Sequence, residues 1–151
     1  MRVSELMSRD VVTVGDTETC YEAVEHMCRR KVRHLPVLDR DGALVGIVTD
    51  RDVRHRLFAF DVYRKIGEVP VSTLLRQAPI REVMSAPVRR IGAGADVAAA
   101  AERMRRDKVG CLPVVDGPRL VGMLTEIDVL RSIAGTEVPG SPELDVIISY
   151  P

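Results

Sequence analysis

Aromatic side chains are scarce in this sequence: its 151 residues include no tryptophan, two phenylalanines and three tyrosines. So few rings argue against a platform that stacks the bases of single-stranded nucleic acid. The formal net charge is zero, so no overall field draws the chain to nucleic acid or to a membrane. No helix-turn-helix pattern is present either. We therefore expect neither nucleic acid nor a membrane among its partners.

Cysteines are also few, and their spacing suits neither a disulfide framework nor a zinc site. The three, Cys20, Cys28 and Cys111, form no CxxC pair, which favours free thiols in a reducing compartment. No apolar run approaches the roughly 20 residues of a membrane span, and the first residues lack the apolar core of a signal peptide. These absences predict a cytoplasmic protein.

Catalytic and cofactor motifs are missing as well. No nucleophile, base and orienting group stand together in a known pattern, and neither a Walker-type phosphate loop nor HExxH occurs. The run Gly92-Ala93-Gly94-Ala95 lacks the third glycine of a dinucleotide fingerprint. We therefore expect no enzyme, no catalytic residue, no metal site and no required cofactor.

The sequence does contain an internal repeat. An offset of 77 aligns the two halves without a gap from Val3 to about Asp39, and it places Leu35-Pro36-Val37 on Leu112-Pro113-Val114. One residue is then lost in a turn, and an offset of 76 aligns residues 46–52 with residues 122–128. Self-similarity at a fixed offset is the signature of a repeat architecture, so we interpret the chain as a tandem duplication.

Each repeat predicts the same order of elements, β-α-β-β-α. In repeat 1 we expect a short helical start at 3–7, a strand at 11–14, a helix at 18–30 capped by Asp16 or Thr17, strands at 35–38 and 43–49, and a helix from residue 50. In repeat 2 we expect a strand at 88–91, a helix at 95–106, strands at 112–115 and 119–125, and a helix at 126–134. One such unit cannot cover its own apolar sheet. The predicted fold is therefore mixed α/β (α+β), with the two units packed sheet to sheet about a pseudo-two-fold axis.

The repeat divides the chain into four parts. We assign residues 1–60 to repeat 1, 61–79 to a partly helical connector, 80–134 to repeat 2 and 135–151 to a C-terminal tail. The second helix of repeat 1 is expected to run past Phe60, and a short helix is expected at 71–77. In the tail, residues 143–148 could form a strand that packs on a neighbour, or they could begin a region that continues past Pro151.

The strand-to-helix junction of each repeat carries a threonine and an aspartate three residues apart, Thr49 with Asp52 and Thr125 with Asp128. Free N–H groups and the helix dipole at such a start favour phosphate, and the threonine hydroxyl can join them. The aspartate suits the paired hydroxyls of a ribose. The same residues also suit a plain helix cap. Duplication copies structural features as well as sites, so both interpretations stay open.

The chain resembles a known family through two motifs, each present twice. They are Leu-Pro-Val followed by Asp39 or Asp116, and a glycine, two hydrophobic residues and Thr-x-x-Asp at residues 46–52 and 122–128. Each repeat resembles a CBS domain, and the pair resembles a Bateman module over roughly residues 1–134. The resemblance implies two facing sheets with two clefts that often bind AMP, ADP, ATP or S-adenosylmethionine. It also implies a flat homodimer formed through helices.

The resemblance further implies which residues form each cleft. The threonine and aspartate of one repeat would hold phosphate and ribose, while the other repeat would contact the adenine. One cleft would use Thr49, Asp52, Arg90, Ile91, Cys111, Leu112 and Pro113. The other would use Thr125, Asp128, Val12, Thr13, His34, Leu35 and Pro36.

The two copies differ beside these motifs. Residues 33–34 are Arg-His where residues 110–111 are Gly-Cys, and residues 89–90 are Arg-Arg where residues 12–13 are Val-Thr. Each arginine could contact phosphate or could be a solvated surface charge. If ligand affinity depends on pH, His34 is the first candidate for the cause.

We therefore expect a stand-alone regulatory module that senses an adenine nucleotide and signals to an effector protein through a shift between conformations. One alternative is a dimerisation or protein-interaction module that binds no nucleotide. Another is the regulatory part of a longer protein.

Overall fold

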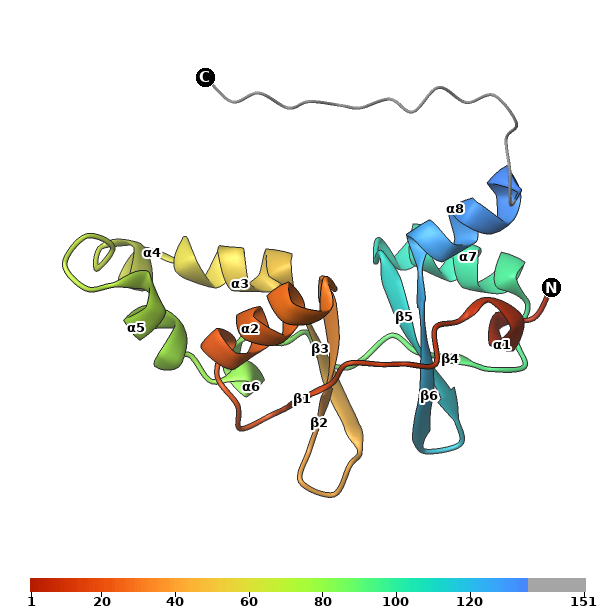
Figure 1. The fold of residues 1–151 in the computed structure, drawn as a ribbon, viewed down its shortest axis with the longest axis horizontal. Coiled ribbons are helices and arrows are strands. Elements are labelled where there is room, and N and C mark those ends of the chain that lie inside the picture. The colour runs from red at the N-terminus through yellow and green to blue at the C-terminus, as the bar shows by residue number, and fades with distance from the viewer. Residues whose placement is uncertain (136–151) are drawn as a thin grey trace.

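The computed structural model describes residues 1–135 and has the predicted mixed α/β fold, with one three-stranded sheet in each repeat (Figure 1). The elements up to the end of repeat 1 are α1 (Val3–Leu6), β1 (Val14–Gly15), α2 (Cys20–Arg30), β2 (His34–Leu38), β3 (Leu44–Thr49) and α3 (Asp50–Leu57). The remaining elements are α4 (Phe60–Tyr63), α5 (Val71–Arg76), α6 (Ile80–Val83), β4 (Ile91–Gly92), α7 (Val97–Asp107), β5 (Cys111–Asp116), β6 (Arg119–Thr125) and α8 (Glu126–Ala134). The strand suggested at 143–148 lies outside the described residues.

Several local predictions were wrong. The first strand of each repeat was expected at 11–14 and 88–91, but β1 is Val14–Gly15 and β4 is Ile91–Gly92. The helix after the first junction ends at Leu57, because the extended backbone at Ala59 (ψ 138°) separates it from α4, which begins at Phe60. The cap of α2 is Thr19 rather than Asp16 or Thr17, and Thr19 forms a capping box with Glu22. Such a reciprocal pair satisfies two backbone donors at once, which makes Thr19 the better start.

Both sheets have the same topology. β1 pairs in parallel with β2, which pairs antiparallel with β3, and β4, β5 and β6 repeat this arrangement. Leu35 lies opposite Val48, and Leu112 lies opposite Leu124; all four side chains are fully buried. Because this register is fixed by burial, each hairpin ends with its threonine at the same edge of the sheet.

The first short helix of each half crosses to the other half. Val3 of α1 is buried in the core formed by α7, β5 and β6, whereas Ile80 of α6 is buried in the core formed by α2, β2 and β3. Figure 1 shows α1 beside α7 and α8, and α6 below α2. The two repeats are therefore linked by an exchange of segments as well as by the chain between them.

A glycine in each central hairpin makes this exchange possible. A Cβ at Gly122 would lie 2.5 Å from Met7 Sδ and 3.0 Å from the Ser8 carbonyl oxygen, and a Cβ at Gly46 would collide with the Met84 side chain. Only glycine lets another chain segment approach a strand this closely.

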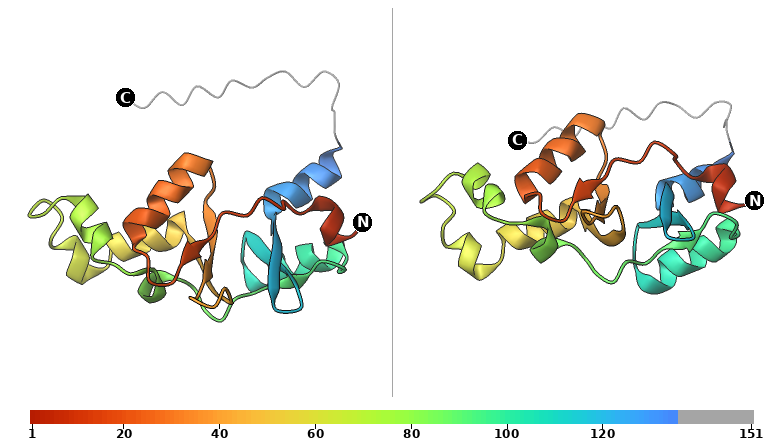
Figure 2. Two further views of the ribbon diagram at one scale, coloured as in Figure 1. Left: turned by 60° about the horizontal axis from the view of Figure 1, so that its bottom comes forward. Right: turned by 90° about the horizontal axis from the view of Figure 1, so that it is seen from below.

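The connector has structure of its own, as predicted for 71–77. Figure 2 shows α4 and α5 at the end of the molecule farthest from the N-terminus. Leu74 of α5 is buried, and the Arg76 guanidinium lies over the Tyr21 ring, 3.6 Å from its centroid. These contacts attach the connector to α2 of repeat 1.

Candidate functional site

The first junction is a complete capping box. β3 runs directly into α3, and the Thr49 hydroxyl accepts a hydrogen bond from the Asp52 N–H at 3.1 Å. Asp52 Oδ2 in turn accepts hydrogen bonds from the Thr49 N–H at 2.9 Å and from its hydroxyl at 3.0 Å. The second junction repeats this geometry with Thr125 and Asp128. In both halves the residue pair therefore caps its helix, whatever else it does.

The backbone donors at the start of α3 are already used. The Asp50 N–H donates to the Arg33 carbonyl oxygen at 3.1 Å, and the Arg51 N–H donates to Asp50 Oδ1 at 2.9 Å. The expectation that free N–H groups here receive a phosphate is therefore wrong for this conformation. An anion beside α3 must be held mainly by side chains.

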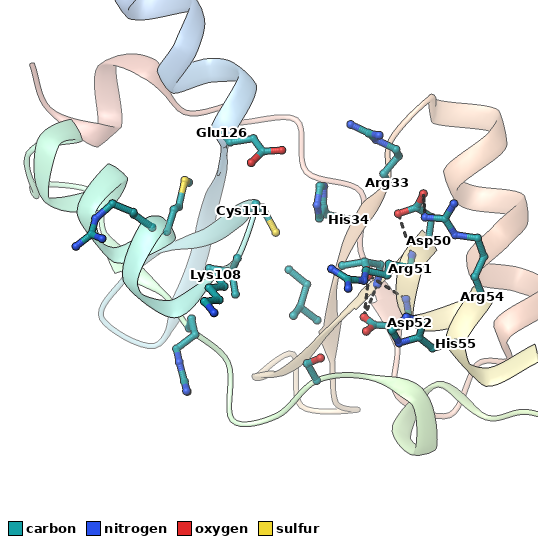
Figure 3. Close-up of a pocket in the computed structure, with 18 of the residues that line it drawn as sticks. Arg33, His34, Asp50, Arg51, Asp52, Arg54, His55, Lys108, Cys111 and Glu126 are labelled. Atoms are coloured by element: carbon teal, nitrogen blue, oxygen red, sulfur yellow. Dashed lines mark hydrogen bonds and ion pairs between the residues drawn. The ribbon is translucent and has the colours of Figure 1, made fainter. Parts of the chain in front are cut away.

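The first cleft, defined by Thr49 and Asp52 on one wall and Lys108 and Cys111 on the other, has a volume of about 710 Å³. This is within the range of small-molecule sites. Figure 3 shows Arg51 and Asp52 at the start of α3 facing Lys108 and Cys111 from the other half, with His34 between them. Both repeats thus line the cleft.

The second cleft, defined by Thr125 and Asp128 with Val12 and Lys31, has a volume of about 320 Å³. Its walls also come from both repeats. The two clefts meet at the centre of the molecule, where they share Arg33, His34, Gly110 and Glu126. These four residues therefore belong to the walls of both clefts.

The structure brings some of the predicted site residues together and places others elsewhere. The residues that line the predicted cleft are Thr49, Asp52 and Cys111 in the first, and Thr125, Asp128, Val12 and His34 in the second. His34 lines the first cleft too. The predicted residues that line neither cleft are Arg90, Ile91, Leu112, Pro113, Thr13, Leu35 and Pro36. Of these, the two Leu-Pro pairs are fully buried in the sheets.

Several cleft residues were missed by the sequence analysis. They include Arg51, Lys108 and Glu126. Arg51 and Glu126 stand inside the two junction motifs, between the threonine and the aspartate, so the motif itself carried the signal. Lys108 aligns with Lys31 in the repeat, and each of these two lysines lines one cleft.

Two titratable groups at the centre have shifted pKa values. Burial, followed by the positive charge of Arg33, lowers the pKa of His34 below its ordinary value of 6.5. The opposing charges of Asp50, Glu126 and Asp52 raise this pKa but do not outweigh burial. Burial, with the negative charges of Asp52 and Glu126, raises the pKa of the Cys111 thiol to about 12. At neutral pH the cleft therefore presents a neutral imidazole and a protonated thiol.

Residues 1–135 contain neither a candidate metal centre nor a candidate membrane-spanning helix. No group of three or more histidine, cysteine, aspartate or glutamate side chains is placed to hold a metal ion there. No helix in this region has the length and apolarity needed to cross a membrane.

Comparison with known proteins identifies both repeats. The family model described as CBS domain matches residues 3–59 and 80–135. A CBS domain-containing protein of Dictyostelium discoideum is 32% identical over 149 residues, covering 93% of this chain and 97% of that protein. Both halves of the chain and nearly the whole of that relative are thus matched.

Other relatives are longer than this chain. The Methanocaldococcus jannaschii protein MJ1404 is 27% identical over 146 residues, and the match covers 96% of this chain but 35% of that protein. Inosine-5′-monophosphate dehydrogenase of Mycobacterium tuberculosis is 36% identical over 128 residues, which cover 83% of this chain and 21% of the enzyme. In these proteins the matched region is a minor part of the length.

A solved structure gives the same fold with ligands bound. The CBS domain pair of protein MJ0100, in complex with 5′-methylthioadenosine and S-adenosyl-L-methionine, has a TM-score of 0.72 and 25% sequence identity. The match covers 91% of this chain and 98% of that one.

Proposed function

The chain belongs to the CBS-domain family, with two CBS domains in tandem, and on this basis we propose that it is a regulatory module that binds adenosine-containing ligands in its two clefts. The ligand class includes AMP, ADP, ATP and S-adenosylmethionine. The proposed module catalyses no reaction and needs no cofactor.

One observation carries this proposal. At each junction the aspartate uses a single oxygen, Oδ2, for the helix cap. Among residues 1–135 no hydrogen bond to Oδ1 of Asp52 or Asp128 is present. A carboxylate held rigidly by its cap, with an oxygen available at a cleft wall, is well placed to accept hydrogen bonds from a pair of ribose hydroxyls.

The remaining parts of an adenosine ligand also have suitable surroundings. In the second cleft Val12 and Met123 provide an apolar wall beside Asp128, and in the first cleft Ile47 and Cys111 do the same beside Asp52. The adenosyl ligands of the MJ0100 domain pair support the same ligand class for this chain. The buried Leu35-Pro36 and Leu112-Pro113 pairs would then position these walls rather than contact the base with their side chains.

The regulatory step in this proposal is a population shift. Each cleft is lined by residues of both repeats, so a bound ligand has contacts that depend on how the repeats are placed. A ligand can shift this placement only by the difference between its affinities for the two states. An effector protein would then recognise the favoured arrangement.

The domain organisation belongs to the proposal as well. We keep residues 1–60 as repeat 1, 61–79 as connector, 80–134 as repeat 2 and 135–151 as tail, with α1 and α6 exchanged between the cores. Cytoplasmic location and homodimerisation are parts of the same hypothesis.

Calorimetric titration with AMP, ATP, S-adenosylmethionine and NADH tests the proposal, with GMP as the control for the base. We expect at least one adenosine ligand to bind and GMP to bind at least about tenfold more weakly, a difference of about 1.4 kcal/mol. Absence of binding by all four adenosine ligands would overturn the proposed function.

A second function is favoured by one observation. Along α8 the side chains of Ile127, Leu130 and Ile133 are 40%, 58% and 78% exposed, which gives a short apolar stripe at helical spacing. Such a stripe fits a module for dimerisation or protein docking. Sedimentation analysis of Leu130→Glu against the unchanged chain tests it. A dimer that this variant loses, in a chain that binds none of the adenosine ligands, supports this function, and an unchanged mass contradicts it.

A further inference from the structure

The two clefts are built from equivalent positions, so their charges can be compared residue by residue. At offset 77, Arg89 of the first cleft corresponds to Val12 of the second. At offset 76, Arg51 of the first cleft corresponds to Ile127 of the second. In both pairs an arginine on the wall of one cleft is replaced by an aliphatic side chain on the wall of the other.

The whole set of wall residues shows the same difference. The cationic side chains of the first cleft are Arg33, Arg51, Arg54, Arg89, Arg105 and Lys108, and its acidic ones are Asp50, Asp52 and Glu126. The cationic side chains of the second are Lys31, Arg33 and Arg131, and its acidic ones are Asp10, Glu126 and Asp128. The first cleft therefore has an excess of positive charge, whereas the second has none.

Several of the first cleft's cations are available to a ligand. Among residues 1–135, Arg33, Arg51 and Lys108 form no ion pair. Arg89 is held by Asp107 at 3.4 Å, with half of the Arg89 side chain exposed. The Asp107 side chain is 14% exposed and also pairs with Arg103 and Arg106, so it keeps two cationic partners when Arg89 turns to a phosphate.

The position of these cations matters because the backbone cannot replace them. The first N–H groups of α3 are engaged with Arg33, Asp50 and Thr49. Arg51 and Lys108 come from opposite halves and face each other across the cleft (Figure 3). Two cations on facing walls can contact different phosphates of one chain, and guanidinium groups bind phosphate particularly well. The first cleft is also the larger, about 710 Å³ against about 320 Å³.

We propose that the two clefts take different classes of adenosine ligand. The first binds a nucleoside polyphosphate, with Arg51, Arg89 and Lys108 contacting the phosphate chain. The second binds an adenosine derivative without a polyphosphate chain, such as a 5′-thioether nucleoside. This assignment rests on the proposed function and adds to it a charge selection specific to each cleft.

Exchanging the residues at one pair of equivalent positions tests the assignment. Arg51→Ile and Ile127→Arg give each cleft the residue of the other, and both positions are exposed, so folding should survive. The probes for calorimetry are ATP, 5′-methylthioadenosine and inorganic tripolyphosphate. Asp52→Asn and Asp128→Asn, which remove a charge from one cleft at a time, report which cleft each probe occupies.

The unchanged chain should bind one ATP. Both Asp52→Asn and Arg51→Ile should weaken ATP binding by about tenfold or more, because each loses a hydrogen bond that involves a charged group. Binding of 5′-methylthioadenosine should weaken in Asp128→Asn and stay unchanged in Arg51→Ile. Ile127→Arg should add a second ATP site.

Three results would overturn the assignment and leave the proposed function standing. They are two equal ATP sites in the unchanged chain, loss of ATP in Asp128→Asn but not in Asp52→Asn, or unchanged ATP affinity in Arg51→Ile. If tripolyphosphate bound as tightly as ATP, the first cleft would be a site for an inorganic polyanion. That result would overturn the claim that the cleft recognises a nucleoside. Failure of ATP and 5′-methylthioadenosine to bind, together with the failure of the panel above, would overturn the proposed function itself.

Discussion

One oxygen of the Asp128 carboxylate, Oδ2, accepts hydrogen bonds from both the backbone N–H and the hydroxyl of Thr125, at 2.8 and 2.7 Å. The Asp128 N–H donates back to the same hydroxyl at 3.3 Å. The pair is therefore part of the fold before any ligand binds. A substitution at this aspartate should change stability as well as affinity, and the two effects have to be measured separately.

Removal of this cap should lower the free energy of unfolding. We expect Asp128→Ala to cost about 0.3–1 kcal/mol, because it removes the N3 carboxylate of the capping box and a negative charge from the first turn of α8. Asp128→Asn should cost less because its amide oxygen can still accept from Thr125. Urea denaturation measures both, with Asp116→Ala, at the exposed end of β5, as the control. Equal stability of Asp128→Ala and the control would contradict the role of the cap.

The close approach of Met7 to Gly122 predicts a second loss of stability. Gly122→Ala should cost about 1–3 kcal/mol, because its Cβ would meet Met7 Sδ and the Ser8 carbonyl oxygen and overpack the site. Gly92→Ala is the matched control, since no atom lies within 4 Å of a Cβ there. Similar urea midpoints for the two variants would show that α1 does not pack against β6 in this way.

His34 predicts a dependence of stability on pH. Because its folded-state pKa is lowered from 6.5, the folded chain binds this proton less readily than the unfolded chain. This residue's contribution to stability is therefore lost as the pH falls through 6.5 toward the folded-state pKa. Urea denaturation at about pH 7.5 and about pH 5.5 should show a smaller loss for His34→Gln than for the unchanged chain. An equal loss in both would contradict the prediction.

The same histidine should link anion binding to protons. A bound phosphate near His34 favours the imidazolium, so binding should take up protons and the affinity for ATP should rise as the pH falls toward 6. Calorimetry in two buffers of different ionisation enthalpy measures the proton uptake. An uptake that persists in His34→Gln would assign it to another group.

The reactivity of the three thiols tests how deeply each cysteine is buried. Burial raises the pKa of Cys20 to about 11 and, with nearby carboxylates, that of Cys111 to about 12. Since the thiolate is the reactive form, exposed Cys28 should react first with Ellman's reagent at neutral pH, and the other two only on unfolding. Rapid reaction of more than one thiol in the folded chain would contradict this.

Much of the fold could be predicted from the sequence because local signals agreed with the repeat. The strand at 119–125 and the helix at 126–134 have the predicted bounds, since an apolar strand there ends at a capping threonine. The exchange of α1 and α6 between the cores was not predicted. Helices of four residues have little periodicity, and which core buries Val3 is decided by tertiary packing alone.

The sequence predicted the threonine and aspartate of each cleft but missed several of the other residues that line the clefts. Burial on a sheet face, rather than position in a motif, decides which side chains reach a cleft. For that reason Leu35 and Pro36 lie in the core, while Arg51, inside the motif but exposed, lines the first cleft. Of Arg89 and Arg90, only Arg89 lines the first cleft. The direction of each side chain just before β4 decides this, and spacing in the sequence does not predict that direction.

The central claim is that the carboxylates of Asp52 and Asp128 bind the ribose of an adenosine ligand. The most direct measurement compares ATP with 2′,3′-dideoxy-ATP by calorimetry, in the unchanged chain and in the double variant Asp52→Asn/Asp128→Asn. We predict that the dideoxy compound binds the unchanged chain at least about tenfold more weakly, and that the double variant binds the two compounds equally and weakly. Equal affinity of the unchanged chain for both compounds, or full ATP affinity in the double variant, would contradict the claim.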